Sequence, residues 1–238
     1  LGTNSIKDTG YDVDNSLRFD DGSSDYLSRT NSSATSTYTF SAWIKLSDPS
    51  PNGNQWIFSS NDSGLIFRDK NSSQEGEQFV FYNNANTTSY YSGAKRRDIS
   101  SWYHVVLSSN SGTGTLYVNG VSDKGSIVVP TLSTSSNAFN IGRLASASSQ
   151  YFSGYMAEVV FIDGQSLDPT SFGEFDEDSG IWKPIDVSGL TFGTNGFYLD
   201  FENSGSLGAD VSGNGNNFTV NNLTSIDQST DTCTNNFA

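Results

Sequence analysis

The chain has 238 residues, a length that fits one large all-β domain or two small domains. Only 34% of the residues are apolar and 16% are charged, and Ser, Thr, Asn and Gly are abundant. This composition favours short strands joined by polar turns and excludes a helical bundle. Twelve basic residues against 26 acidic ones give a net charge of −14, so neither nucleic acid nor an anionic membrane surface is an expected partner. We expect a single folded domain over residues 1–238.

Cysteine and histidine are almost absent. Cys233 is the one cysteine and His104 the one histidine, which excludes an intramolecular disulfide and a Cys/His zinc site. A Ser or Cys catalytic triad has only His104 available as its base. No apolar run reaches the roughly 20 residues of a membrane-spanning helix, so we expect no membrane insertion. The scarcity of thiols favours an extracellular or virion-surface location.

Alternating apolar and polar residues predict a series of strands. The clearest lies at residues 38–46, where Tyr38, Phe40, Ala42, Ile44 and Leu46 form the predicted inner face. Further strands are predicted at residues 55–60, 64–69, 77–83, 101–109 and 115–123. The Asn119-Gly120 pair in the last of these suits the positive φ angles of a tight hairpin turn.

The second half of the chain begins with a long predicted strand at residues 151–164, which is apolar on both faces and is expected to be central. Asp168 and Pro169 then predict a short surface helix over residues 168–175. A strand, a Gly/Asn/Asp-rich loop and another strand follow within residues 196–220, and the aperiodic tail, 225–238, is expected to pack loosely. The pattern predicts an all-β fold, an antiparallel jelly-roll β-sandwich.

Several motifs occur in an order similar to that of a known family. The segments SLRFDDGSSDYL, YTFSAWIKL, SWYHVVLSS with TLYVNGV, and FSGYMAEVVFIDGQSLDP together resemble the laminin-G-like branch of the concanavalin A-like lectin/glucanase superfamily over residues 16–175. The resemblance implies a concanavalin A-like sandwich and a carbohydrate-binding function. The family usually has two acidic residues late in its last long strand. Here Ala157 stands at the first of these positions and Glu158 matches the second.

The C-terminal segment GFYLDFENSGSLGADVSGNGNNFTV resembles the part that normally opens such a domain. Either the sandwich is circularly permuted and residues 196–220 supply a strand to it, or a neighbouring repeat begins here. We favour permutation, because an isolated aromatic strand would leave an exposed edge. The C-terminal third also resembles uncharacterised structural and tail-associated proteins of marine bacteriophages, which implies a virion protein.

The loop ADVSGNGNN is a candidate calcium site. Asp210, Asn214 and Asn216 alternate oxygen-bearing side chains with glycines, as a loop that folds around a hard cation would require. Further ligands are expected from the acidic turn FDDGSSD, which contains Asp20, Asp21 and Asp25. The alternative interpretation of both segments is a plain turn without metal.

Aromatic residues beside amide and hydroxyl side chains are candidates for sugar binding, since pyranose rings present both C–H faces and hydroxyl groups. The residues in this position are Trp56, Tyr90, Tyr91 and Trp182. Arg96, in the basic run 95–97, is a candidate for holding a sulfated or uronic sugar. Packing within the protein, or a solvated loop, is the alternative for each. We interpret His104 as a structural residue.

These features lead to three hypotheses about function. The first is a non-catalytic glycan-binding or adhesion module of a phage virion surface or tail protein, assisted by calcium. Its expected partners are a host-surface or extracellular polysaccharide, other virion proteins and further copies of the chain. The second is a purely structural virion assembly or decoration protein. The third is a glycoside hydrolase of the laminarinase type that uses Glu174, Asp176 and Asp178.

Overall fold

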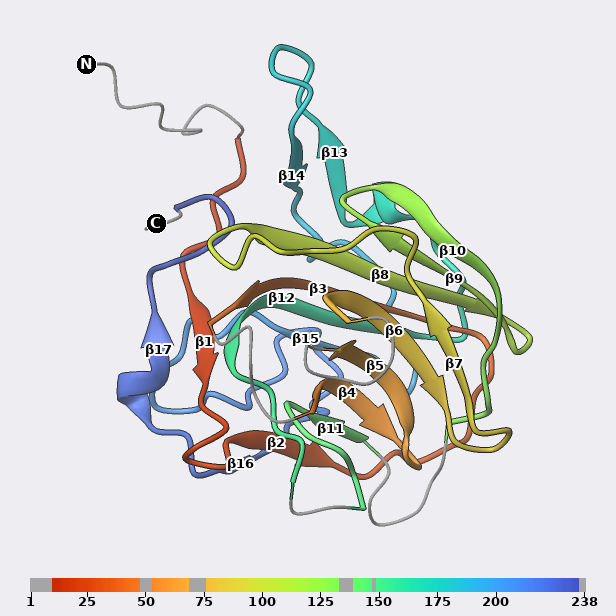
Figure 1. Ribbon diagram of the computed structural model, residues 1–238. Helices are drawn as coiled ribbons and strands as arrows, with labels where there is room; N and C mark the ends of the chain where they lie inside the picture. Colours follow the sequence, from red (N-terminus) through yellow and green to blue (C-terminus); the bar gives the residue numbers. More distant parts are fainter. Residues whose placement is uncertain (1–9, 48–52, 69–75, 133–138, 147–148, 236–238) are drawn as a thin grey trace.

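The computed structural model describes residues 10–47, 53–68, 76–132, 139–146 and 149–235. The described chain forms two large antiparallel sheets packed face to face, plus a small hairpin that projects from them (Figure 1). This is the all-β sandwich predicted from the sequence, with a strand order consistent with a concanavalin A-like jelly roll.

The first sheet, sheet A, has the strand order β10-β9-β8-β3-β12-β1-β17, and β15 also pairs with β12. Its strands are β1 (Ser16–Phe19), β3 (Tyr38–Leu46), β8 (Trp102–Asn110), β9 (Thr113–Val118), β10 (Val121–Val128), β12 (Gly154–Asp163), β15 (Phe197–Leu199) and β17 (Gln228–Ser229). As predicted, the long strand β12 lies inside the sheet, where it pairs with β1, β3 and β15.

The second sheet, sheet B, has the order β16-β2-β11-β4-β5-β6-β7. Its strands are β2 (Tyr26–Arg29), β4 (Asn54–Ser60), β5 (Ser63–Arg68), β6 (Gln78–Asn83), β7 (Thr88–Tyr91), β11 (Phe139–Ile141) and β16 (Thr219–Asn221). The small hairpin consists of β13 (Gly173–Phe175) and β14 (Trp182–Pro184), and the two 3₁₀ turns are η1 (Pro169–Ser171) and η2 (Ser225–Asp227).

The core between the sheets is built from aromatic rings. The predicted inner face of β3 lies in it, and Phe139 of β11 contacts rings from both halves of the chain. The Phe139 centroid lies 5.5 Å from that of Phe58 and 5.5 Å from that of Phe197. It also lies 6.3 Å from that of Phe218. The segment 196–221 therefore contributes β15 to sheet A, β16 to sheet B and two rings to the core.

The two outer faces of the sandwich differ. Residues that follow β12, together with both ends of the described chain, cover the outer face of sheet A, so Trp43, Trp102 and Val160 are buried there. The outer face of sheet B has only a small apolar cluster over β4, β5 and β6. Because no further layer of chain covers this cluster in the described structure, a hollow between the side chains of sheet B is open to solvent.

A β-bulge interrupts β12 at Glu158, which has a φ of +50°. The extra residue shifts the alternation, so Met156 and Val159 both face the core while Glu158 lies under the cover of sheet A. Its carboxylate oxygen Oε2 accepts hydrogen bonds from the hydroxyls of Tyr11 (2.8 Å) and Tyr198 (2.7 Å). Burial raises the pKa of Glu158 to about 7.

The structure corrects two expectations. The predicted helix over residues 168–175 is a single 3₁₀ turn, because Gly173 already begins β13 and its Cα packs against the Trp182 ring. The tail, described to residue 235, packs against the sandwich and is not loose as expected. β17 pairs with β1, and Asp231 forms an ion pair with Lys45 (2.9 Å). The described residues include no helix long and apolar enough to cross a membrane.

We expect Phe139→Ala to lower the free energy of unfolding by about 3–5 kcal/mol, because the cavity would open at the junction of both sheets. Urea denaturation measures the change. Phe175→Ala is the matched control, since Phe175 is 51% exposed and should cost much less. Equal losses in the two variants would contradict the central role assigned to Phe139.

The raised pKa of Glu158 predicts that the stability of the fold depends on pH. Its folded pKa of about 7 lies above the ordinary value of 4.5, so the folded state retains a proton that the unfolded chain releases. The contribution of Glu158 to stability should be fully present below about pH 4.5 and should fall by roughly 2–3 kcal/mol as the pH rises to about 7. Glu158→Gln should flatten this dependence in urea melts at pH 4.5, 5.5, 6.5 and 7.5. An unchanged slope in the variant would contradict the assignment.

Candidate functional site

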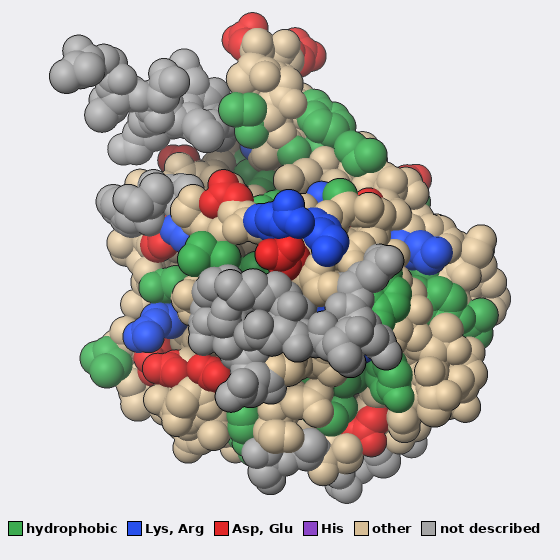
Figure 2. Space-filling view, in the orientation of Figure 1, with side chains coloured by type: hydrophobic (Ala, Val, Ile, Leu, Met, Phe, Trp, Pro, Cys, Tyr) green, Lys and Arg blue, Asp and Glu red, His purple; other side chains and the backbone are tan. Residues whose placement is uncertain are grey.

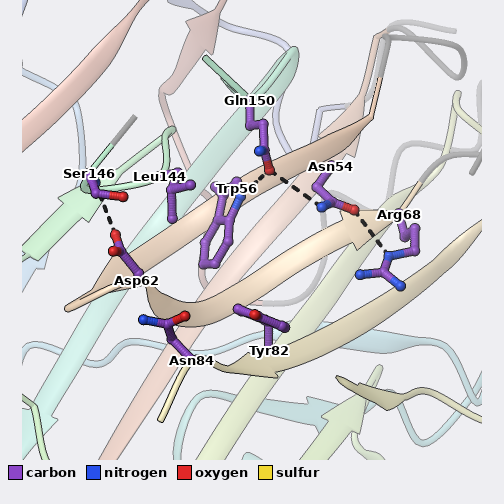
Figure 3. Close-up of a pocket in the computed structure, with 9 residues that line it drawn as sticks. All are labelled: Asn54, Trp56, Asp62, Arg68, Tyr82, Asn84, Leu144, Ser146 and Gln150. Atoms are coloured by element: carbon purple, nitrogen blue, oxygen red, sulfur yellow. Dashed lines mark hydrogen bonds between the residues drawn. The ribbon is translucent and has the colours of Figure 1, made fainter. Parts of the chain in front are cut away.

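The hollow on the outer face of sheet B has a volume of about 330 Å³, within the range of small-molecule sites (Figure 3). We call it the aromatic basin. Its floor is formed by Trp56 of β4 and Tyr82 of β6, whose ring centroids lie 6.2 Å apart at 89°. Its lining consists of Asn54, Trp56, Asp62, Arg68, Tyr82, Asn84, Leu144, Ser146 and Gln150.

Local backbone features place these side chains. A bulge in β4 lets Ile57 and Phe58 both face the core while Trp56 faces outward. The β4–β5 turn consists of Asn61 and Asp62, with φ angles of 48° and 59°. Two successive positive φ angles match the twist of a two-residue hairpin. This tight turn holds the Asp62 carboxylate at one end of the basin.

Hydrogen bonds fix the opposite end of the basin (Figure 3). Gln150 Oε1 accepts from Trp56 Nε1–H (2.9 Å) and from Asn54 Nδ2–H (3.4 Å). Asn54 Oδ1 in turn accepts from Arg68 Nε–H (3.0 Å), and another Arg68 N–H donates to the Tyr91 hydroxyl. Arg68 is 8% exposed, and its guanidinium donates to other side chains of the protein, so this end of the basin is rigid.

The end near the β4–β5 turn has polar groups available to a ligand. Asp62 Oδ1 accepts from the Ser146 backbone N–H (3.0 Å), whereas Oδ2 has no hydrogen-bond partner in the described part of the chain. The Asn84 side-chain amide is exposed and likewise has no partner among these residues. A carboxylate oxygen and an amide beside an aromatic floor can bind vicinal hydroxyls while a ring packs on Tyr82.

The predicted ligand residues do not gather in one site. Trp56 is 2% exposed and forms the basin floor rather than a projecting platform. Tyr91 bonds Arg68 behind the basin, and Tyr90 packs against the core. Arg96 pairs with Asp123 (2.8 Å), so its charge is already compensated. On the face drawn in Figure 2, several Lys and Arg side chains adjoin one another in the upper middle with acidic side chains beside them, and the other basic residues are scattered.

Trp182 is the first residue of β14 in the projecting hairpin, and its side chain is buried against sheet A, so it does not form a sugar platform. Its Nε1–H donates to His104 Nδ1 (2.9 Å), and the indole packs against Gly120. His104 Nε2 therefore carries the ring proton and donates to Ser41 Oγ (2.8 Å). Burial lowers the pKa of His104 to about 3, so the ring is neutral and structural.

The ADVSGNGNN loop does not fit calcium. Both Asp210 oxygens accept backbone N–H groups, from Tyr198, Ser212 and Asn216. The side-chain oxygen of Asn216 accepts from the Arg29 guanidinium (2.8 Å), a cation that would repel a metal ion. Asn214 directs its amide Nδ2 at the carbonyls of Gly193 and Gly196.

The acidic turn at Asp20–Asp25 is arranged differently. Asp20 Oδ1 caps the Gly22 N–H, and the Asp21 carbonyl accepts from Ser24 N–H. Asp25 is 2% exposed, and its Oδ1 is buried without a hydrogen-bond partner in the described chain. The turn and the Asp210 loop lie at opposite ends of β2, about 13 Å apart along the strand, so they do not share an ion. No three acidic, His or Cys side chains gather in metal-binding geometry within the described ranges.

The acids considered for glycoside hydrolysis lie on the β13–β14 hairpin, away from the basin. Glu174 and Asp176 both pair with Lys183, at 3.4 and 3.2 Å. Hydrogen bonds from Ser179 and Lys183 hold the pKa of Asp176 at about 2. A general acid requires a raised pKa, so this carboxyl does not suit that role.

The sequence matches the family model described as the concanavalin A-like lectin/glucanases superfamily over residues 21–169. The chain therefore belongs to this superfamily, as the motif order indicated. No curated protein matches the sequence.

Solved structures share the fold at low identity. A proposed carbohydrate-binding protein from Bacteroides ovatus superimposes with a TM-score of 0.57 at 19% identity, covering 88% of this chain. This chain spans only 58% of that protein. A second structure is domain 4 of the arabinanase AbnA from Geobacillus stearothermophilus, in complex with arabinotriose. Its TM-score is 0.47 at 17% identity, and the match covers 61% of this chain and 69% of that domain. A heptameric pentraxin from Limulus polyphemus has a TM-score of 0.48 at 17% identity, and the match covers 65% of this chain and 78% of the pentraxin chain.

Sequence reasoning found Trp56 but missed the groups that complete the basin. Asp62 and Asn84 lie in turns and Gln150 lies just before β12, where composition alone indicates only a polar loop. The Asn61-Asp62 pair between two apolar strands is a hairpin signal that could have placed Asp62 at a sheet end. Tyr82 lies two residues after Val80 and alternates with the core residues Phe79 and Phe81, so it could have been assigned to the outer face with Trp56.

Proposed function

We propose that the protein is a non-catalytic carbohydrate-binding module whose ligand site is the aromatic basin. The observation that carries the proposal is the combination of the Trp56–Tyr82 floor with the unpartnered polar groups of Asp62 and Asn84. An apolar ring face and two adjacent hydroxyls are the features of a pyranose that such a site recognises. Membership in a superfamily of lectins and glucanases supports the same class of ligand.

The preferred ligand is a neutral sugar. The Arg68 guanidinium already donates to Asn54 and Tyr91, so it has little left to offer a ligand carboxylate. Asp62 contributes a negative charge at the other end, which favours hydroxyl donors over anions. The virion setting is a further proposal, which has its support in the C-terminal sequence resemblance to phage proteins.

Tyr82→Ala and Asp62→Asn test the basin. Asp62→Asn keeps the oxygen that accepts from Ser146 and tolerates the positive φ, but it replaces the free carboxylate oxygen by an amide. We expect each variant to bind neutral oligosaccharides about tenfold more weakly in calorimetry, and Asp62→Asn to do so with an unchanged melting temperature. Arabinotriose, laminaritriose and agarose oligosaccharides are suitable probes.

Asp178→Asn is the matched control, because it removes one carboxylate at the tip of the β13–β14 hairpin, remote from the basin. Weakening by Asp178→Asn as large as that by Asp62→Asn would locate the site elsewhere. Absence of binding across neutral oligosaccharides would overturn the proposal. Release of reducing sugar that Asp62→Asn abolishes would contradict the non-catalytic role.

We also propose a calcium ion at the Asp20–Asp25 turn, since a cation would satisfy the buried, unpartnered Asp25 Oδ1. Millimolar calcium should then raise the melting temperature relative to EDTA by several degrees. Asp25→Asn should abolish this calcium-induced shift. Asp210→Asn should lower the melting temperature but keep the calcium-induced shift. No shift in the wild type would exclude the ion.

A further inference from the structure

A second hollow lies beside β2 and β16 and shares no lining residue with the aromatic basin. Its volume is about 480 Å³, and Arg29 is its one charged lining residue. We call it the Arg29 hollow. Its lining consists of Ser28, Arg29, Thr30, Gly215, Asn216, Asn217 and Thr219.

The guanidinium of Arg29 is held in a fixed plane. Nη1–H donates to the Asn195 carbonyl (2.7 Å) and Nη2–H donates to Asn216 Oδ1 (2.8 Å). The guanidinium carbon lies 5.8 Å from the Phe197 centroid and 5.7 Å from the Phe218 centroid. A guanidinium has five N–H donors, and the others have no acceptor in the described chain. These donors are available to an oxyanion, a group that guanidinium binds through paired N–H bonds.

No carboxylate among the described residues forms an ion pair with Arg29. Asp163 and Asp210 are the acids whose charges act on Arg29, and both accept hydrogen bonds from other groups. Asp163 Oδ2 accepts from the backbone N–H and the side-chain amide of Asn195 (2.9 and 2.8 Å), and Asp210 accepts three backbone N–H groups. Burial lowers the pKa of Arg29 despite these acids, although the group stays protonated at any physiological pH. Its charge is only partly compensated.

The rim adds further donors. Asn217 Oδ1 accepts from the Asp210 backbone N–H (2.9 Å), which leaves the Asn217 amide Nδ2 as the group without a partner. Thr30 and Thr219 are exposed and bring hydroxyls. The acceptor on Ser28 is occupied by Asn221 Nδ2–H (3.2 Å). The hollow therefore offers N–H donors from Arg29 and Asn217 and hydroxyls from Thr30 and Thr219. A calcium site would instead need several oxygen acceptors directed at one point.

We propose that the Arg29 hollow binds a sugar oxyanion, the carboxylate of a uronic acid or a sulfate ester. Guanidinium binds both groups through paired N–H bonds, and the Asn and Thr groups on the rim suit the neighbouring hydroxyls. The net charge of −14 disfavours a dense polyanion. The fitting ligand is thus an isolated acidic residue in an otherwise neutral polysaccharide. This goes beyond the neutral-sugar site, because the two hollows use different residues.

Asn217→Asp is the decisive variant. It keeps the oxygen that accepts from Asp210 N–H but replaces the free amide donor by a second carboxylate oxygen beside Arg29. The probes are glucuronate, galactose 6-sulfate, inorganic sulfate and neutral methyl glucoside, followed by NMR titration. We expect both acidic sugars to bind the wild type, with affinity that falls as salt rises, and Asn217→Asp to bind them about tenfold more weakly. Asp62→Asn in the aromatic basin should leave anion binding unchanged.

The outcomes separate this site from the basin. Loss of acidic-sugar binding in Asn217→Asp, with neutral oligosaccharide binding retained, supports the proposal. Equal binding of methyl glucoside and glucuronate would overturn it, as would equal anion affinity in Asn217→Asp and the wild type. Binding of inorganic sulfate without either acidic sugar would overturn the assignment to a polysaccharide. Arg29→Lys, which keeps the charge but loses the fork, should also weaken binding, and Asn217→Asp decides if that variant does not fold.

Discussion

The sandwich depends on the packing of Phe197 and Phe218 against Phe139. Phe197 and Phe218 come from the last fifth of the chain, while Phe139 comes from a three-residue strand in the middle of sheet B. Phe197 and Phe218 also contact each other at 4.8 Å, so a single aromatic cluster joins β15 of sheet A to β16 of sheet B. Without it, the edge of sheet B beside β2 would lose a strand and the core would be open to water.

The same contact creates the Arg29 hollow. The rings that close the core flank the Arg29 guanidinium, and the loop between their strands supplies Asn216 and Asn217. The fold therefore couples core closure to the presentation of a positive group in an acidic protein. The aromatic basin arises independently, on the open side of the sheet, from a bulge in β4 and a tight turn. Two chemically different hollows thus share one sheet.

Local pattern predicted the strands and the family, because period-two alternation and the Asn119-Gly120 turn are properties of neighbouring residues. It failed where a single extra residue changed the face. The bulge at Glu158 placed Met156 and Val159 on the same side, although strict alternation separates them. It also failed where the partner was distant in the sequence. Nothing near Asn216 indicates that Arg29, 187 residues away, takes its oxygen, and nothing near Trp182 indicates its bond to His104.

The two ends of the described chain lie side by side on the covered face, remote from the aromatic basin. Val13 N–H donates to Thr234 Oγ1, and the antiparallel pairs Ser16–Ser229 and Leu17–Gln228 follow directly. A pulling force applied through both ends would therefore load β1 and β17 in an unzipping geometry, in which the pairs rupture one after another and not together. Under tension β17 would therefore separate from β1 first, while sheet B, which carries the aromatic basin, stayed intact.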